Sequence, residues 1–213
     1  MSFGLPDPAT LWPALIAAAI FLLLGFPVHE FSHALVADRL GDRTARFMGR
    51  LTLNPLVHFD AMGGTVLVIS AVFFSFVVGW AKPTPVNPSN LQGGRRGEAW
   101  VALAGPASNL IMATIFAIPI RLLVATQTSV PSLVALVLSN LVWFNVFLFM
   151  FNLLPIPPLD GYKVLTGLVD ARTAFRLRQL EQYGFILILF IFLFGARILL
   201  PIGNGIYGFL VGQ

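Results

Sequence analysis

The chain lacks cysteine altogether and has few charged residues. Without cysteine, neither a disulfide framework nor a thiolate metal site can form. Charged residues make up 10% of the 213 residues and hydrophobic residues 57%, whereas an ordinary soluble domain has about 25% charged residues. This composition predicts an integral membrane protein. We expect one membrane-embedded domain over residues 1–213, because no soluble stretch precedes, separates or follows the hydrophobic runs.

The chain also has only a small excess of positive over negative charge. The formal net charge is +4, and the lysines and arginines stand in loops beside apolar runs. That placement is typical of membrane orientation signals and not of a nucleic-acid-binding surface. We therefore expect the lipid bilayer as a partner, and no nucleic acid.

Several apolar runs approach or exceed the length of about 20 residues that crosses a hydrocarbon core. They predict an all-α polytopic bundle of about four spanning helices, over residues 11–37, 98–124, 133–156 and 183–200. The run 62–80 contains three glycines and leads into three prolines at 83, 85 and 88. Prolines exclude a helix there and favour a short extended or β segment.

The first run contains two histidines and a carboxylate, which are expensive to place in a bilayer. His29 and His33 are four residues apart, so on a helix they share one face. Glu30 lies about 100° around the same helix, where it can border a metal ion without ligating it. This His-Glu-x-x-His pattern is typical of zinc hydrolases, in which the glutamate is the general base.

A catalytic zinc usually takes three protein ligands and a water. Asp160 follows a proline-rich stretch at the end of the run 133–156. It could be the third ligand or could merely cap the next helix. His58 could also ligate by residue type, although the Asn-Pro turn before it favours a role near the ligands or in anchoring the loop. Asn109 in the run 98–124 needs a polar partner, which could be a side chain of another helix or a group of the active site.

A shared metal ion also constrains the topology. The histidines and Asp160 both lie toward the carboxyl ends of their runs, so these two helices must cross in the same direction, with an odd number of crossings between them. We therefore expect the run 62–80 to be re-entrant. Eleven of the 13 lysines and arginines then lie on the side of the site. Because positive loops face the cytoplasm, we expect the site on the cytoplasmic side and the N-terminus outside.

Five motifs together resemble the site-2 protease family of intramembrane zinc metalloproteases, in its compact prokaryotic form. They are HEFSH at 29–33, NPLVH at 54–58, GWAKP at 79–83, AGPASN at 104–109 and NLLPIPPLDG at 152–161. The resemblance covers roughly residues 20–170 and implies a prokaryotic plasma-membrane protein.

The resemblance implies zinc held by His29, His33 and Asp160, with Glu30 as the catalytic base. It also implies that Asn152 lies near the active site and holds substrate. The stretch beginning at Lys82 resembles the membrane-embedded segment that pairs with a substrate strand. We take Lys82, Asn152 and Asn109 as candidate substrate contacts, and His58 as a candidate for the surroundings of the ligands.

The predicted activity is hydrolysis of a peptide bond within or beside a transmembrane helix of a membrane-protein substrate, in regulated intramembrane proteolysis. One alternative is a metal-binding membrane protein without hydrolysis, which would need no base beside its ligands. Another is a scaffold that binds transmembrane helices without cutting them, which could lose a ligand or the base. The three candidate ligands and the candidate base are all present here.

Overall fold

The computed structural model describes residues 8–73 and 82–213, and the elements in these ranges are all helical. The main helices are α1 (Pro8–Ile20), α2 (Phe26–Arg39), α3 (Thr44–Phe47), α4 (Pro55–His58), α5 (Ala61–Phe73), α6 (Arg95–Thr126), α7 (Ser132–Asn152), α8 (Asp160–Leu168), α9 (Ala171–Arg178), α10 (Gly184–Phe194) and α11 (Ala196–Val211). Three short pieces complete them, a π-helical turn η1 (Phe21–Gly25) and the 3₁₀ turns η2 (Pro88–Asn90) and η3 (Glu181–Tyr183).

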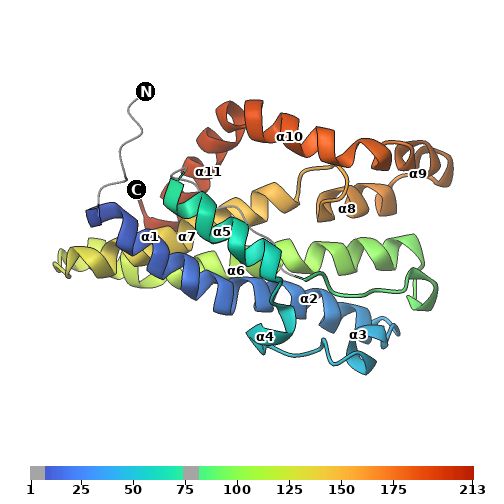
Figure 1. Cartoon of the computed structure of the whole chain (residues 1–213), viewed down its shortest axis with the longest axis horizontal. Helices are drawn as coiled ribbons and strands as arrows, with labels where there is room; N and C mark the ends of the chain where they lie inside the picture. The colour runs from blue at the N-terminus through green and yellow to red at the C-terminus, as the bar shows by residue number, and fades with distance from the viewer. Residues whose placement is uncertain (1–7, 74–81) are drawn as a thin grey trace.

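Within the described ranges, three continuous helices are long and apolar enough to cross a membrane, namely Leu11–Arg39, Arg95–Thr126 and Ser132–Asn152. They lie side by side along the long axis of the molecule (Figure 1). Ala37 at the end of the first packs with Val101 near the start of α6, and Ala17 packs with Leu141 in the first half of α7. The first helix and α7 therefore run in the same direction, with α6 antiparallel between them in the chain.

The first spanning helix widens just before the histidines. Pro27 has no N–H and its ring would clash with the carbonyl four residues earlier. The helix accommodates it with the π turn η1, where the N–H of Phe26 donates to the carbonyl of Phe21. Such π turns are frequent at functional sites.

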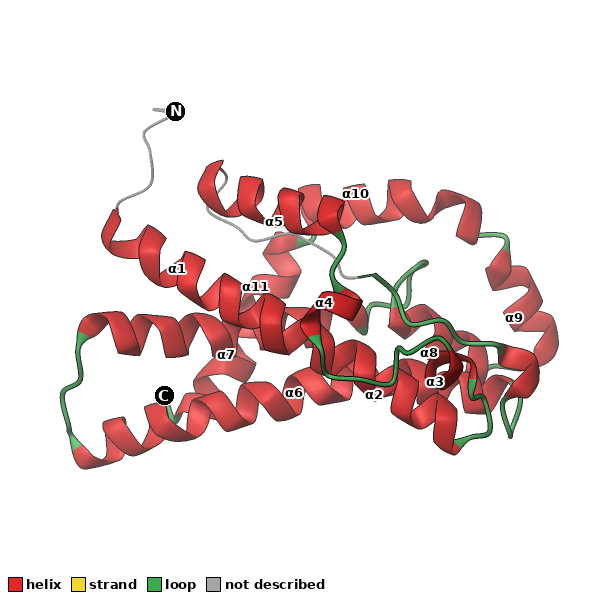
Figure 2. Cartoon of the chain, turned by 60° about the horizontal axis from the view of Figure 1, so that its bottom comes forward, coloured by secondary structure: helices red, strands yellow, loops and turns green. Residues whose placement is uncertain are grey.

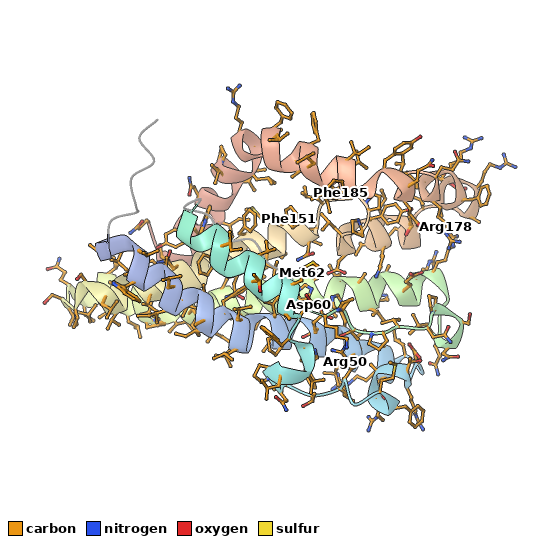
Figure 3. All side chains as sticks on the ribbon, in the orientation of Figure 1. Arg50, Asp60, Met62, Phe151, Arg178 and Phe185 are labelled. Carbon is orange, nitrogen blue, oxygen red and sulfur yellow. The ribbon has the colours of Figure 1, made fainter. Side chains whose placement is uncertain are left out.

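A fourth spanning helix over 183–200 is not found. That run is divided at Gly195 between α10 and α11, which have 11 and 16 residues. α11 returns to the bundle, where a Cβ on Gly203 would lie 2.7 Å from both Trp143 and Met150. α10 stands apart from the spanning helices (Figure 1), and its apolar side chains are largely exposed, with Phe185 80% accessible (Figure 3).

The chain between the first helix and α6 leaves and returns at one end of the bundle, the end that carries the histidines. The described part of α5 has 13 residues and so is about 20 Å long, against the roughly 30 Å of a hydrocarbon core. The N–H of Lys82 donates to the carbonyl of His58 at 2.8 Å, so the two ends of this excursion meet. The re-entrant run expected at 62–80 falls partly outside the described residues, since it includes 74–80.

The extended or β segment is not found as a strand, because residues 82–87 have no regular secondary structure. The segment is nevertheless fixed to the end of α2. Asp42 is fully buried and its carboxylate accepts hydrogen bonds from the N–H of Asn87, the side chain of Asn90, and both the N–H and hydroxyl of Thr44. Burial acts to raise the pKa of Asp42, but these donors together lower it below its ordinary value.

The basic stretch 162–182, expected as one surface helix, forms α8 and α9 with a break at Val169 and Asp170. α8 is held on α6, where Arg95 Nη1 donates to the carbonyls of Thr166 and Val169 at 3.3 and 3.2 Å. α9 lies beyond it at the end of the molecule that carries Arg178 (Figure 3).

Candidate metal centre

The two histidines of α2 face one point together with Asp160. Their Nε2 atoms are 3.1 Å apart. Asp160 Oδ2 lies 3.3 Å from His29 Nε2 and 3.2 Å from His33 Nε2. Among the described residues, this is the one group of three or more histidine and carboxylate side chains that could hold a metal ion. Both histidines are buried, at 5% and 7% exposure.

Asp160 reaches this point because the chain folds back sharply after α7. Three consecutive turn bonds, from Ile156 to Leu154, Leu159 to Ile156 and Tyr162 to Leu159, bring α8 over the end of α7. Gly161 permits the close approach, since a Cβ there would overlap the carbonyls of Leu153 and Leu154. Asp160 is the first residue of α8, whose N-cap position, Leu159, has no side-chain cap bond.

Two effects oppose each other on the charge of Asp160. Burial raises the pKa of its carboxyl group, but the positive charge and the hydrogen bonds that the facing imidazoles of His33 and His29 supply when they are protonated lower the pKa well below its usual value. The carboxylate is therefore charged at neutral pH, as a metal ligand must be.

The second nitrogen of each imidazole is oriented by an oxygen. His33 Nδ1 lies 2.7 Å from the carbonyl of Val101, and His29 Nδ1 lies 2.6 Å from Asn109 Oδ1. A carbonyl oxygen can only accept, so each Nδ1 carries a proton, and in the neutral imidazole each Nε2 then points a lone pair at the common point. This is the usual arrangement around metal-ligating histidines.

These three atoms fit a metal ion by distance and by chemistry. In a tetrahedral zinc site, with bonds of roughly 2.0–2.1 Å, ligand atoms are about 3.3 Å apart. The observed separations are 3.1, 3.2 and 3.3 Å. Two lone pairs and a carboxylate that converge in a buried space repel one another unless a cation or a proton lies between them. The donor set of two imidazoles and one carboxylate suits zinc, although other divalent ions can use it.

Helix α6 leaves room for the metal by placing a glycine against it. A Cβ built on Gly105 would overlap His33 Nε2 and would lie 2.6 Å from His29 Nε2. No real Cβ atom approaches other atoms this closely. Gly105 therefore keeps open the space into which both imidazole lone pairs point.

Glu30 is buried, at 9% exposure, and is held by the segment 82–87. The N–H of Thr84 donates to Glu30 Oε2 at 2.6 Å, and the hydroxyl of Thr84 donates to the backbone carbonyl of Glu30 at 3.0 Å. One carboxylate oxygen is thus fixed, and the described residues make no hydrogen bond to the other.

The remaining candidates lie in different surroundings. Asn109 is fully buried against His29, which favours a positioning role over substrate contact. Asn152 is half-buried and donates from Nδ2 to the carbonyl of Leu148 at 3.1 Å. The side chain of Lys82 is exposed.

His58 anchors its loop. Its Nε2 lies 2.7 Å from the carbonyl of Thr52, and its own carbonyl accepts from Lys82. Arg50 Nη1 secures the same loop by donating to the carbonyl of Val57 at 2.5 Å (Figure 3). His58 is not among the residues grouped around the candidate metal.

Three contributors to the site escaped the sequence analysis. Thr84 lies between two prolines, and Gly105 is one of many glycines. Asn145, whose Oδ1 accepts from Asn109 Nδ2 at 3.2 Å, is one of three asparagines in its run. The only signal for Asn145 is a polar side chain in an apolar run. Nothing local in the sequence indicates that Thr84 contacts Glu30, because 54 residues separate them.

The fold and the site define a class. The described residues form a helical integral membrane protein (Figure 2). In it, α2 and α8 bring together a three-residue group that could hold a metal ion, and α2 also carries a buried glutamate.

Comparison with known proteins agrees with this class. The model of peptidase family M50 matches residues 17–130 and 118–196. The chain is 40% identical over 207 residues to "Putative zinc metalloprotease YwhC" of Bacillus subtilis, covering 92% of this chain and 89% of that protein. It is 33% identical over 172 residues to "Putative zinc metalloprotease Rip2" of Mycolicibacterium smegmatis, covering 78% of this chain and 62% of that protein. No solved structure gives a significant match.

The chain belongs to peptidase family M50, the site-2 protease family, and it is a metalloprotease.

Proposed function

We propose that the chain is an intramembrane zinc endopeptidase that cuts membrane proteins within or beside a transmembrane helix, in regulated intramembrane proteolysis. The observation that carries the proposal is the convergence of His29 Nε2, His33 Nε2 and Asp160 Oδ2 within 3.1–3.3 Å of one another, beside a buried Glu30. The printed names of the relatives, which are zinc metalloproteases, support zinc as the metal.

In this proposal His29, His33 and Asp160 hold the zinc ion. A bound zinc ion supplies a Lewis acid that makes water nucleophilic at neutral pH and stabilises negative charge on the scissile carbonyl oxygen. Asn109 and the carbonyl of Val101 keep the two imidazoles in the ligating tautomer. The surrounding buried helices exclude bulk water, which strengthens these interactions.

Glu30 is the general base. One of its oxygens is fixed by the N–H of Thr84, so the other is left to take the proton of the attacking water. The same group then delivers that proton to the leaving amine. Because the base is fixed through the segment 82–87, any movement of that segment also moves the base.

The segment 82–87 and Asn152 are the proposed substrate contacts. A substrate helix must unwind before its carbonyl is accessible, and an extended neighbour can replace the lost hydrogen bonds. Prolines have no N–H to offer, and the N–H groups of the segment that are already bonded are those of Lys82, Thr84 and Asn87. The carbonyls of Pro83, Thr84 and Pro85 accept no bond from the described residues, so substrate would bind mainly by donating its own N–H groups.

The site is proposed to face the cytoplasmic side of a prokaryotic plasma membrane. The end of the bundle that carries the site also carries α3, α8 and α9 and the start of α6 (Figure 1). These elements and their loops hold most of the arginines, and positive loops remain on the cytoplasmic side.

Removing the metal should abolish cleavage reversibly. The full chain is reconstituted in proteoliposomes with a reporter protein that carries one transmembrane helix, and fragments are followed by mass spectrometry. A membrane-permeant chelator should reduce cleavage to background, and stoichiometric zinc should restore it. Because the ligands come from α2 and α8, the apoprotein should also unfold at a lower temperature than the zinc-loaded chain.

The other outcomes correspond to the alternative functions. Binding of the reporter helix to the zinc-loaded chain without fragments would favour a non-catalytic scaffold. Movement of zinc into sealed vesicles would favour a transporter. Cleavage that persists at the full rate in metal-free protein would overturn the proposed metal dependence.

A further inference from the structure

Asn145 of α7 is a polar side chain that is fully buried in the middle of an apolar helix. Its amide is bonded at both ends. Nδ2 donates to the carbonyl of Leu141 at 2.9 Å, and Oδ1 accepts from Asn109 Nδ2 at 3.2 Å. Asn109 in turn contacts His29. The four groups form one continuous chain of hydrogen bonds from the backbone of α7 to a candidate metal ligand on α2.

The donor-to-acceptor direction of this series of hydrogen bonds is fixed at the end formed by the carbonyl of Leu141. The carbonyl of Leu141 can only accept, so the NH₂ group of Asn145 must face it and the oxygen of Asn145 must face Asn109. The NH₂ group of Asn109 must then face Asn145, which turns the oxygen of Asn109 toward His29. That oxygen also can only accept, so the proton of His29 lies on Nδ1.

The other histidine does not need such a chain. His33 is oriented by the backbone carbonyl of Val101, which has no donor to offer in place of its oxygen. Asn109 is different, because a half-turn of its amide would present NH₂ to His29 Nδ1. His29 would then carry its proton on Nε2 and would lose the lone pair that the metal needs. Among the described residues, the group that holds the Asn109 amide in the first of these orientations is its partner on α7.

We propose that Asn145 is a positioning residue that fixes, through Asn109, the ligating tautomer of His29. The inference rests on the metal site of the proposed function and adds a residue of a helix that supplies no ligand. Outer partners of metal-ligating histidines typically change metal affinity by 10–100-fold. We expect the loss of Asn145 to weaken metal affinity by a factor in this range, although Asn145 does not touch the ligand.

The first test uses Asn145→Leu, which keeps the approximate volume and removes both hydrogen bonds. Zinc affinity is measured on the detergent-purified full chain by competition with a fluorescent chelator. We expect binding to weaken about 10–100-fold. The matched control is Asn140→Leu on the same helix, since Asn140 is not part of this chain of bonds, and its zinc affinity should stay within about threefold of the parent.

A second variant distinguishes positioning from folding. Asn109→Asp has oxygen atoms at both positions, so it cannot present a donor to His29 in either orientation. The amide of Asn145 can turn so that its NH₂ group donates to this carboxylate in place of the carbonyl of Leu141. The variant should then bind zinc within about threefold of the parent, because carboxylate partners of ligating histidines are common. A loss as large as that of Asn145→Leu would contradict the inference, because it would show that the bonds matter for packing and not for the tautomer.

The third measurement needs no metal, so it separates this inference from the proposed function. The chain has three histidines, so ¹⁵N-histidine labelling gives few ring signals. Every sample also carries Asp160→Ala, which removes the carboxylate that faces His29 Nε2. In this zinc-free protein at about pH 8.5, where imidazoles are ordinarily neutral, His29 should be protonated on Nδ1 with Asn145 intact and with Asn140→Leu. In Asn145→Leu the two tautomers should be mixed. A pure Nδ1 tautomer and unchanged zinc affinity in Asn145→Leu would overturn the inference.

Discussion

Replacing Glu30 with glutamine should abolish most cleavage and leave the metal in place. The amide has nearly the same shape as the carboxylate, and its oxygen can still accept the N–H of Thr84, which now lies 2.6 Å from Glu30 Oε2. It cannot take a proton from water. General-base catalysis contributes about 10²–10⁴-fold, so we expect a loss of that order in the rate of reporter cleavage in proteoliposomes.

The comparison needs a second glutamate variant and a metal measurement on the same samples. Glu98→Gln removes a carboxylate from the first turn of α6, outside the candidate metal group, and should cleave at the parent rate. Zinc per chain, measured by mass spectrometry after gel filtration, should be equal in all three proteins. Cleavage by Glu30→Gln at the parent rate would refute Glu30 as the base.

A single methyl group at Gly105 should expel the metal. Alanine is the better helix former by about 1 kcal/mol, so helix propensity alone would favour Gly105→Ala. Its Cβ, however, would occupy the space between the two imidazoles and would lie 2.6 Å from His29 Nε2. The imidazoles must then turn away from their common point. We expect at least a 100-fold loss of zinc affinity and loss of cleavage.

Gly205→Ala is the matched control for this substitution. Gly205 also lies inside a helix, α11, and a Cβ there would meet nothing within 4 Å. This variant should bind zinc and cleave as the parent does. Full zinc occupancy in Gly105→Ala would show that the metal does not lie where the two histidines converge.

The parts of the site that share a local pattern could be predicted from the sequence. The spacing of His29 and His33 is enough to place both imidazoles on one helix face. Asp160 required a longer argument from the direction of the spanning helices, and the structure brings its carboxylate to within 3.3 Å of both histidines. Both inferences use regular helical geometry, which the amino-acid pattern specifies well.

The contacts made by irregular or distant chain could not be predicted. Thr84 reaches Glu30 through a segment without regular structure, and its position depends on Asp42 at the end of α2. The role of Asn145 depends on which face of α7 meets α6, where Ala113 and Ala117 share a buried cluster with Val142 and Val146. Hydrophobicity alone also failed to show that the last run divides at Gly195, since both halves are apolar.

The central claim is that one zinc ion is held by α2 and α8 together, and the zinc content of the Asp160→Ala variant tests it most directly. The parent and the variant are purified in detergent, incubated with excess zinc, desalted and analysed for metal per chain. We predict about one zinc per parent chain and loss or strong weakening of binding in Asp160→Ala. Full retention of zinc by the variant, or its absence from the zinc-supplied parent, would contradict the three-ligand site.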